Sequence, residues 1–225
     1  MSETEQAYYK KLSWLRHIAG EKNNQPNQHT TNMSTELNYS YPLAEGTISG
    51  LVYGNAKYDD DNKRYLPVNP ELMELLEQKI LEMIDNGYDL NQMDGHFCEE
   101  LQSRPLQAII EGIPNVSVEF VQKIIDKGAD VNIYFCESDY YENFGAEDYI
   151  DGYWGIDILG NEMYAPLHLA TMNNRIDLMQ LLISAGADVN LKAGNDEKVP
   201  LDFAKTEETR KVLIDAGADE SLAQD

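Results

Sequence analysis

The apolar residues of this chain recur at helical spacing in several segments, and each of these segments stops at a glycine. The two closest copies run from Val121 to Asn132 and from Leu178 to Asn190, and both end in Gly-Ala-Asp-Val-Asn or its near equivalent. A weaker copy spans 81–91, and a last one spans 212–219. The pattern predicts a helix that ends at a glycine, where a left-handed backbone costs little, followed by a short extended exit. Four copies of such a segment are typical of a stacked repeat protein.

The same pattern divides the chain into regions. Residues 3–19 carry apolar positions at helical spacing, so we predict a helix there. Asn69 is a favourable N-cap and Pro70 suits the first helical position, so the first clear repeat helix is predicted to begin at this point. The predicted regions are an N-terminal helix or appendage at 1–20, a flexible linker at 21–35, a degenerate N-terminal capping unit at 36–69 and a repeat domain at 70–225.

Two linked motifs resemble the ankyrin repeat. Residues 165–170 read Ala-Pro-Leu-His-Leu-Ala, close to the Thr-Pro-Leu-His-x-Ala that opens the first helix in that family, and Gly-Ala-Asp-Val-Asn follows at 186–190. Degenerate openings occur at 104–108, 199–204 and 41–44. The resemblance implies an all-α ankyrin-repeat solenoid of about four helix-turn-helix repeats. It assigns a structural role to Pro105, Leu106, Gly128, Pro166, Leu167, His168, Gly186, Pro200, Leu201 and Gly217.

The histidine of the motif needs separate mention because it could suggest catalysis. In the ankyrin pattern this side chain braces the turn through hydrogen bonds to the backbone. The resemblance therefore implies a structural role for His168.

One connection between motifs is irregular. The distance from a terminal glycine to the next motif proline is 18 residues from Gly87 and 14 from Gly186, but 38 from Gly128 to Pro166. A family period of about 33 residues leaves about 13 for this connection, so about 25 residues are inserted between the second and third clear repeats. We call residues 133–164 the insertion. In ankyrin repeats this connection is the hairpin finger at one edge of the binding groove, so the resemblance implies a long inserted finger.

The insertion holds nine aromatic residues and eight acids, and it has no Lys or Arg. Tyr and Trp give large contact areas at low entropic cost, and carboxylates among them would pair with basic groups of a partner. Long loops are usually functional or disordered, and the aromatic content argues against disorder. Alternatively, the rings fold onto the repeats as a satellite core. The predicted partner-binding residues are Tyr140, Tyr141, Glu142, Asp148, Tyr149, Asp151, Tyr153, Trp154 and Asp157.

The charge of the chain bears on the kind of partner. The formal net charge is −23, and the insertion, with eight acids and no base, contributes −8 of it. Such a surface repels phosphates and anionic lipids, so direct binding to nucleic acid or membrane is disfavoured, whereas a basic partner would be steered towards it. The charge could also serve solubility alone. Without an apolar run of about 20 residues or a secretory signal, the chain is expected to be cytoplasmic.

No motif predicts a metal site or a catalytic centre. His96, Cys98 and Glu99 match no zinc spacing, and the acidic run at 59–62 lacks the later ligands of a calcium loop. Cys98 and Cys136 are expected to be reduced thiols. The sequence has no phosphate loop, dinucleotide fingerprint or nucleophile elbow. We therefore expect no cofactor, no metal and no enzymatic activity.

The sequence favours a non-enzymatic protein-binding module. A small, acidic ankyrin chain with one elaborated finger resembles the bacterial ankyrin-type immunity proteins that neutralise toxins. We therefore predict that it binds and inhibits a basic protein, such as a toxin or nuclease, through the inserted finger and the repeat groove. Two other hypotheses stay open: a scaffold or adaptor linking cellular proteins, and an acidic DNA mimic. The oligomeric state also stays open.

Overall fold

The computed structural model describes residues 46–59, 62, 64–92, 104–134, 164–194 and 196–224. All of them belong to one compact part of the chain, residues 36–225. The predicted regions at 1–20 and 21–35 lie outside the described residues. None of the described helices combines the length and the apolar character that crossing a membrane requires.

Within the described ranges the helices occur as four successive pairs, which we number first to fourth. They are α2 (Ile48–Asn55) with α3 (Pro70–Asp85), α4 (Pro105–Gly112) with α5 (Val118–Asp126), α7 (Pro166–Met172) with α8 (Ile176–Ser184), and η5 (Pro200–Phe203) with α9 (Glu207–Asp215). A short 3-10 turn, η6 (Glu220–Leu222), follows the last pair.

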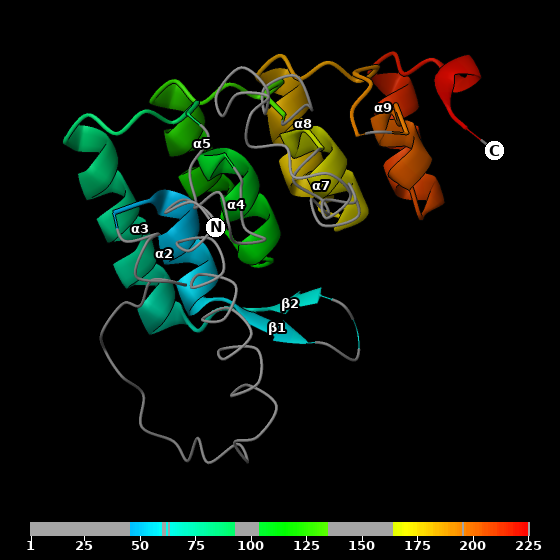
Figure 1. The fold of residues 1–225 in the computed structure, drawn as a ribbon. Coiled ribbons are helices and arrows are strands. Elements are labelled where there is room, and N and C mark those ends of the chain that lie inside the picture. Colours follow the sequence, from blue (N-terminus) through cyan, green and yellow to red (C-terminus); the bar gives the residue numbers. More distant parts are fainter. Residues whose placement is uncertain are drawn as a thin grey trace, which may run out of the picture. The chain divides into compact units, whose positions relative to one another are not determined.

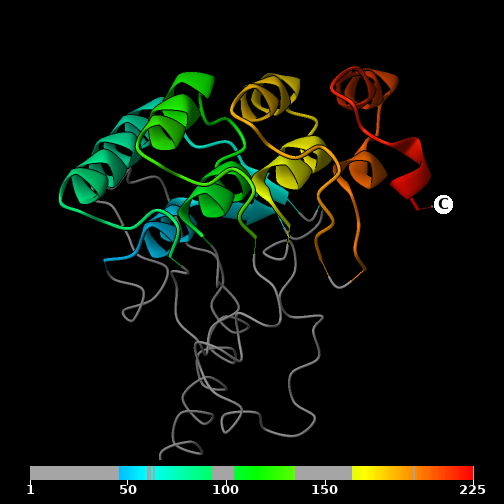
Figure 2. The same ribbon diagram turned by 90° about the horizontal axis from the view of Figure 1, so that it is seen from above.

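The pairs stack to form a helical repeat solenoid (Figures 1 and 2). In one row α2, α4, α7 and η5 lie side by side, and each contacts the next. In the other row α3 is followed by α5, α8 and α9, and α8 contacts both α5 and α9. The apolar side chains between neighbouring pairs are fully buried, as Ile109 of α4 and Leu182 of α8 are. Each pair therefore covers the apolar face of its neighbour.

A few residue types explain where the helices begin and end. Pro105, Pro166 and Pro200 open helices of the first row, where the missing N–H group needs no partner. The leucines that follow, Leu106, Leu167 and Leu201, are buried. Each second-row helix ends at a glycine with positive φ, which is 92° at Gly87, 102° at Gly128, 94° at Gly186 and 98° at Gly217. The glycine N–H group and the N–H group after it bond back to the last turn, so the final carbonyl groups of the helix are satisfied.

The asparagine at the end of each exit ties one pair to the next. The Asn132 amide donates to the Gly186 carbonyl group at 3.0 Å, and its Oδ1 accepts from the Asp188 N–H group at 2.7 Å. The same two bonds recur one pair earlier, from Asn91 to Gly128 and Asp130, and one pair later, from Asn190 to Gly217 and Asp219. We call these contacts the asparagine ladder. They hold each glycine turn at a fixed place relative to the preceding pair.

A second set of polar contacts joins the turns inside the pairs. Asn115, between α4 and α5, both donates to and accepts from the backbone of Val68, each at 2.8 Å. Arg175, at the start of α8, donates to the carbonyl groups of Pro114 at 2.6 Å and Val116 at 2.8 Å. The turn of the second pair is thus bonded to the first pair on one side and to the third on the other.

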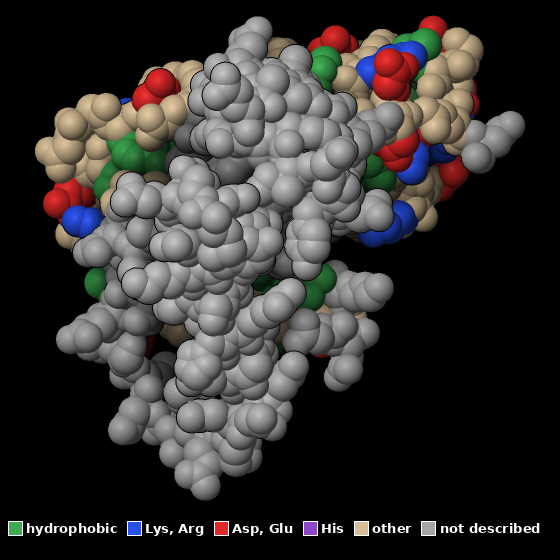
Figure 3. Space-filling view, in the orientation of Figure 1, with side chains coloured by type: hydrophobic (Ala, Val, Ile, Leu, Met, Phe, Trp, Pro, Cys, Tyr) green, Lys and Arg blue, Asp and Glu red, His purple; other side chains and the backbone are tan. Residues whose placement is uncertain are grey.

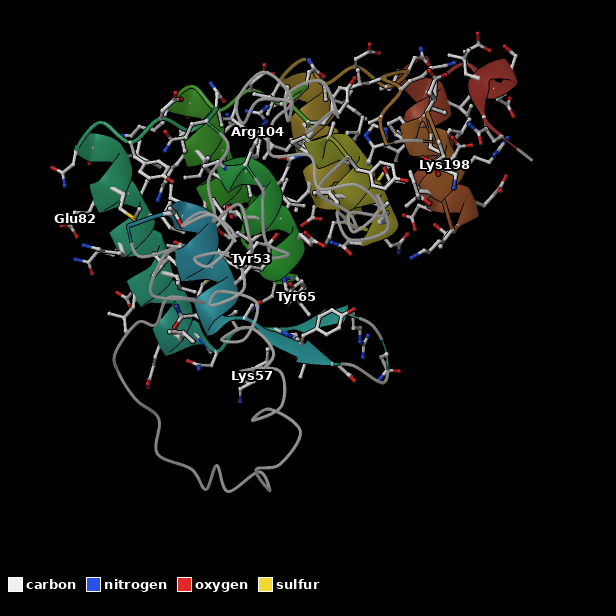
Figure 4. All side chains as sticks on the ribbon, viewed as in Figure 1. Tyr53, Lys57, Tyr65, Glu82, Arg104 and Lys198 are labelled. Carbon is white, nitrogen blue, oxygen red and sulfur yellow. The ribbon has the colours of Figure 1, made fainter. Side chains whose placement is uncertain are left out.

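The expectation of an all-α fold is wrong in one place. Between α2 and α3 the chain forms an antiparallel hairpin, β1 (Lys57–Asp59) with β2 (Arg64–Leu66), in which Tyr58 lies opposite Tyr65. The Tyr65 ring lies 5.7 Å from the ring of Tyr53 on α2 and 5.1 Å from the ring of Tyr58, and Figure 4 shows Tyr53 and Tyr65 close together. Strands of three residues leave almost no period-2 pattern in the sequence, which is why the pattern did not predict them. Aromatic contacts that form only in the fold hold the hairpin.

The first described helix of the stack, α2, has Thr47 as its N-cap. The Thr47 hydroxyl accepts from the Gly50 N–H group at 3.0 Å and caps α2. The proline-containing opening predicted at 41–44 lies outside the described residues. Because α2 contacts both α3 and α4, the predicted boundary between residues 69 and 70 falls inside a helix pair.

We predict that Asn132→Ala lowers the free energy of unfolding by about 1–2 kcal/mol, because it removes two hydrogen bonds between the second and third pairs. Asn86→Ala is the matched control, since Asn86 is exposed at the end of α3 and takes no part in the ladder. Urea denaturation of both variants measures the difference. Equal losses in the two variants would contradict a role of the ladder in stability.

Candidate partner-binding surface

Nearly all of the insertion lies outside the described residues. This includes all of its predicted partner-binding residues, Tyr140, Tyr141, Glu142, Asp148, Tyr149, Asp151, Tyr153, Trp154 and Asp157. The structure describes residues 133–134 at one end of the insertion and Tyr164 at the other. The candidate surface is therefore built from these two ends and from the residues that hold them.

The insertion starts directly after a rung of the asparagine ladder. Asn132 is bonded to the glycine turn after α8, and Ile133 and Tyr134 follow as half-buried residues. The chain therefore leaves the second pair at a point that is tied to the third pair.

The insertion ends at Tyr164, which α4 holds through a buried amide. Gln107 of α4 is fully buried, and its Nε2 donates to the Tyr164 carbonyl group at 2.7 Å. Its Oε1 accepts from the Arg104 N–H group at 3.1 Å at the start of the same helix. One side chain thus satisfies a helix terminus and fixes the point where the insertion rejoins the stack.

The next connection along the chain is short and is held in the same way. Residues 191–194 and 196–199 belong to a hairpin, which we call the short finger, with Ala193 bridged to Lys198. The imidazole Nε2 of His168 lies 3.1 Å from the carbonyl groups of both Leu191 and Lys198. His168 therefore ties together the two stems of the short finger.

The two arrangements correspond position by position. His168 and Gln107 each follow the proline of their motif by two residues. Lys198 and Tyr164 each precede the next motif proline by two residues, and each offers its carbonyl group to the buried side chain of the preceding motif. Tyr164 therefore rejoins the stack at the position of an ordinary finger stem.

The Tyr164 side chain contacts the short finger and η5. Its hydroxyl donates to Asp196 Oδ1 at 3.0 Å. Partial burial, and then the hydrogen bond to Asp196 and its charge, raise the pKa of Tyr164 to about 12, so the phenol stays protonated at neutral pH. The ring lies 4.9 Å from the Phe203 ring and 5.7 Å from the His168 imidazole. At Gly194 an added Cβ would lie 2.5 Å from the Tyr164 ring, so only glycine leaves room for it.

Asp196 extends these contacts to the C-terminal tail. Its Oδ2 lies 2.8 Å from Lys198 Nζ, which in turn lies 5.7 Å from the centre of the Phe203 ring (Lys198 in Figure 4). Its backbone carbonyl group accepts from Gln224 Nε2 at 2.6 Å. Burial acts to raise the pKa of Asp196, but hydrogen bonds from Lys198 and Tyr164 outweigh it and hold the pKa below its usual value. We call the joined residues the Tyr164 clasp: Tyr164, Gly194, Asp196, Lys198, Phe203 and Gln224.

The charges at the α9 end of the stack are mixed in sign. Figure 3 shows acidic side chains beside Lys and Arg over this part of the surface. The ion pairs here are largely exposed, as between Arg210 and Glu220 or Lys211 and Asp215, so each contributes about 0–1 kcal/mol. Within the described ranges, no group of three or more His, Cys, Asp or Glu side chains could hold a metal ion. The insertion differs from this end in having acids and no base.

The similarity to known proteins is carried by the third helix pair. Residues 164–193, which contain α7 and α8, match the ankyrin repeat model. Ankyrin repeat and SOCS box protein 6 from Homo sapiens is 41% identical over 64 residues, which are 27% of this chain and 15% of that protein. The third helix pair is thus an ankyrin repeat, and the chain is similar to ankyrin-repeat proteins. The repeats indicate a protein–protein interaction module.

Other relatives also match over part of their length. The Mus musculus protein of the same name is 39% identical over 64 residues, 27% of this chain and 15% of that protein. Alpha-latrocrustotoxin-Lt1a from Latrodectus tredecimguttatus is 27% identical over 147 residues, 60% of this chain and 9% of that protein. The matched part of this chain thus spans between 9% and 15% of these relatives.

The sequence pattern did not single out the Tyr164 clasp. Tyr164 counted only as one of the aromatic residues of the insertion, and Asp196 and Gln224 carried no motif. The signal that could have found Tyr164 is its place two residues before Pro166, which matches the place of Lys198 in the next connection. The contacts with Asp196 and Gln224 depend on side-chain packing that no spacing encodes.

We predict that the free energy of unfolding falls as the pH is lowered from 7 to 5, partly through His168. Burial lowers the pKa of this imidazole, although hydrogen bonds to backbone carbonyl groups oppose the shift. The unfolded chain takes up a proton near pH about 6.5, whereas the folded chain resists it to lower pH. The unfolded state therefore binds more protons in this window, and stability rises with pH across it.

The matched variant is His168→Gln, because this chain places Gln107 at the same position of the preceding motif. Urea denaturation at pH 7 and pH 5 should show a smaller pH dependence in this variant than in the original chain. The same pH dependence in both would show that His168 does not titrate as its burial implies.

Proposed function

We propose that this chain is a non-enzymatic ankyrin module of four repeats, one for each helix pair, that binds and inhibits a basic protein as an immunity protein inhibits a toxin. The observation that carries the proposal is the anchoring of Tyr164 by Gln107, which matches the anchoring of the short finger by His168. The insertion accordingly occupies a finger position, at the edge of the binding groove in this family. A partner would meet acids and aromatic rings that project from a packed scaffold.

The charge of the insertion supports a basic partner. Its eight acids stand in 32 residues without a single Lys or Arg, whereas the described end of the stack has bases among its acids, as in the pairs of Arg210 with Glu220 and of Lys211 with Asp215. Complementary charges speed encounter and suppress partners of the same sign. The affinity itself would come from aromatic anchors, since Tyr and Trp are the residues that most often carry binding energy at protein interfaces.

Inhibition of a nuclease or a similar toxin is the form of binding that best suits this chemistry. The cleft of such an enzyme is built to hold phosphates with Lys and Arg, and carboxylates form strong charge-assisted hydrogen bonds with the same groups. An acidic insertion that enters the cleft would exclude the substrate. The acids of the insertion, and not those on the helices, should then determine affinity.

We predict that replacing four acids of the insertion with amides (Glu142→Gln, Asp148→Asn, Asp151→Asn and Asp157→Asn) weakens partner binding by about tenfold or more. The matched control removes the same charge from exposed helix positions through Glu71→Gln, Glu74→Gln, Glu119→Gln and Glu207→Gln. The control should lose much less, because salt screens charges beyond about 8 Å at physiological ionic strength.

The partner for this measurement is the protein that co-purifies with the tagged full chain from its source cells. Dissociation constants are compared at low and high salt. An inhibitor that acts through charge loses affinity steeply as salt rises, and the acidic variant should lose this salt dependence. A dissociation constant that changes neither with the salt concentration nor with the loss of the acids would favour a scaffold built on apolar contacts.

We predict further that replacing Tyr140, Tyr141, Tyr153 and Trp154 with Ala lowers affinity by at least about tenfold, because these rings would supply the buried anchors. Tyr58→Ala serves as the control, since Tyr58 is 50% exposed on the hairpin outside the insertion. Circular dichroism shows whether each variant remains folded. Unchanged affinity of the folded quadruple variant would rule out the insertion as the binding site.

A further inference from the structure

The first glycine turn differs from the other three in the residue that comes before the glycine. The terminal glycines of the second, third and fourth pairs follow Lys127, Ala185 and Ala216. Gly87, which ends the first pair, follows Asn86, an exposed residue at the end of α3. Asn86 is also the one asparagine in the sequence that a glycine follows. This pair of residues is chemically reactive, because glycine has no side chain to shield its backbone nitrogen from the amide before it.

An asparagine in this position can lose its amide without an enzyme. The backbone nitrogen of Gly87 gives up its proton and bonds to the side-chain carbonyl carbon of Asn86, whose bond to the amide nitrogen breaks, so that ammonia leaves with that proton. The cyclic imide that results then takes up one molecule of water. Attack of water on one carbonyl group of the ring gives aspartate. Attack on the other gives isoaspartate, in which the backbone runs through the side chain and is one carbon longer.

The folded turn holds the two reacting atoms apart. Asn86 has a ψ of 8°, which turns the Gly87 nitrogen away from the Cβ atom of Asn86, so the ring closes only after rotation of the backbone. The Gly87 N–H group donates to the Ile84 carbonyl group at 2.9 Å, and the N–H group after it donates to the Met83 carbonyl group at 3.1 Å. The reaction therefore needs an opening of the turn in which these bonds break.

The same turn is a junction between α3, which it ends, and two other helices. The hydroxyl of Tyr88, directly after the glycine, accepts from the Ile48 N–H group at the start of α2 at 3.3 Å. Asn91 carries the first rung of the asparagine ladder, and its carbonyl group accepts from the Arg104 guanidinium at the start of α4. A change of the backbone at Gly87 would thus affect both the position of α2 and the register of the second pair.

We propose that Asn86 is a site of spontaneous deamidation, that opening of the first glycine turn sets its rate, and that conversion to isoaspartate loosens the junction between the first and second pairs. The longer backbone of isoaspartate cannot keep both N–H groups of the turn on their carbonyl partners. A carboxylate at this position also adds negative charge next to Asp85 at the C-terminal end of α3, where the helix dipole disfavours it.

The test is incubation of the full chain in warm, mildly alkaline buffer with and without urea, followed by peptide mapping and mass spectrometry. Loss of the amide raises the mass of the peptide that contains Asn86. We expect this conversion to be at least about tenfold slower in the folded chain than in the unfolded chain, because the closed turn blocks the attack. Equal rates in the two states would overturn the protection by the turn. Absence of conversion in urea would overturn the site itself.

Asn91→Ala tests whether the opening is local. It removes the two bonds that hold the exit of the first turn to the second pair, so we expect Asn86 to convert about threefold to tenfold faster in the folded variant. Asn190→Ala is the matched control, since it removes the same two bonds between the third and fourth pairs, and it should leave the rate unchanged. Equal acceleration in both would show that Asn86 reacts through global unfolding, against the proposal.

Tyr88→Phe is a milder variant for the case in which Asn91→Ala does not fold. It removes only the hydroxyl that accepts from Ile48, and it should also speed the conversion of Asn86. Unchanged rates in the folded variants would refute control by this turn. Asn86→Ala, which introduces the residue of the third and fourth turns, should show no gain of mass at this position.

The effect of the product is measured by amide hydrogen exchange on the isoaspartate form, separated from the aged chain by chromatography. We expect exchange about threefold to tenfold faster in α2 and in residues 128–134, and no change in α9. Asn86→Asp is the matched control, because it brings the charge without lengthening the backbone. If the isoaspartate form exchanges like this variant, the longer backbone does not loosen the junction, and that part of the proposal is wrong.

Discussion

The structure depends on the bonds by which each exit asparagine holds the next glycine turn. A helix pair of this size has an apolar face that it cannot bury alone, so it is stable only against a neighbour. Apolar contact is not directional and would tolerate sliding of one pair over the next. The bonds from Asn132 to Gly186 and Asp188 are directional, and they recur at each step of the second row. They therefore set the register in which the buried leucines and isoleucines meet.

The irregular segments sit at two different edges of this stack. The hairpin of β1 and β2 interrupts the first pair on the side of the turns, where Asn115 bonds to Val68 and Arg175 bonds to the turn of the second pair. The insertion interrupts the opposite side, where the exits run. The helices on either side of each connection contact one another, as α4 contacts α7 and α5 contacts α8, so the stack continues across both. This separation lets one ankyrin stack carry segments of unusual length.

The buried polar residue of each motif links this scaffold to the candidate surface. Gln107 and His168 are both fully buried, and each uses its side chain to hold the stem of the connection that follows. Tyr164 then adds what the short finger lacks, a side chain that reaches the neighbouring connection and bonds to Asp196. The acidic, aromatic segment ends at a residue that is held by two helix pairs. The C-terminal end of the insertion is therefore fixed to the helix stack.

The sequence by itself determined the resemblance to ankyrin repeats, the helices of the stack from Pro70 onward and the connection that departs from the repeat. These follow from local rules: proline opens a helix, glycine ends it, and leucine spacing marks the buried face. The first described helix, α2, is capped by Thr47 and has no proline at its first position, and the short strands have no clear period-2 pattern, so the sequence pattern predicted neither. Only the tertiary structure decided that Asn115 meets Val68 and that Tyr164 reaches Asp196 and Phe203. Such contacts join residues 32 or more positions apart, and their geometry arises from packing that exists only after the helix pairs have stacked.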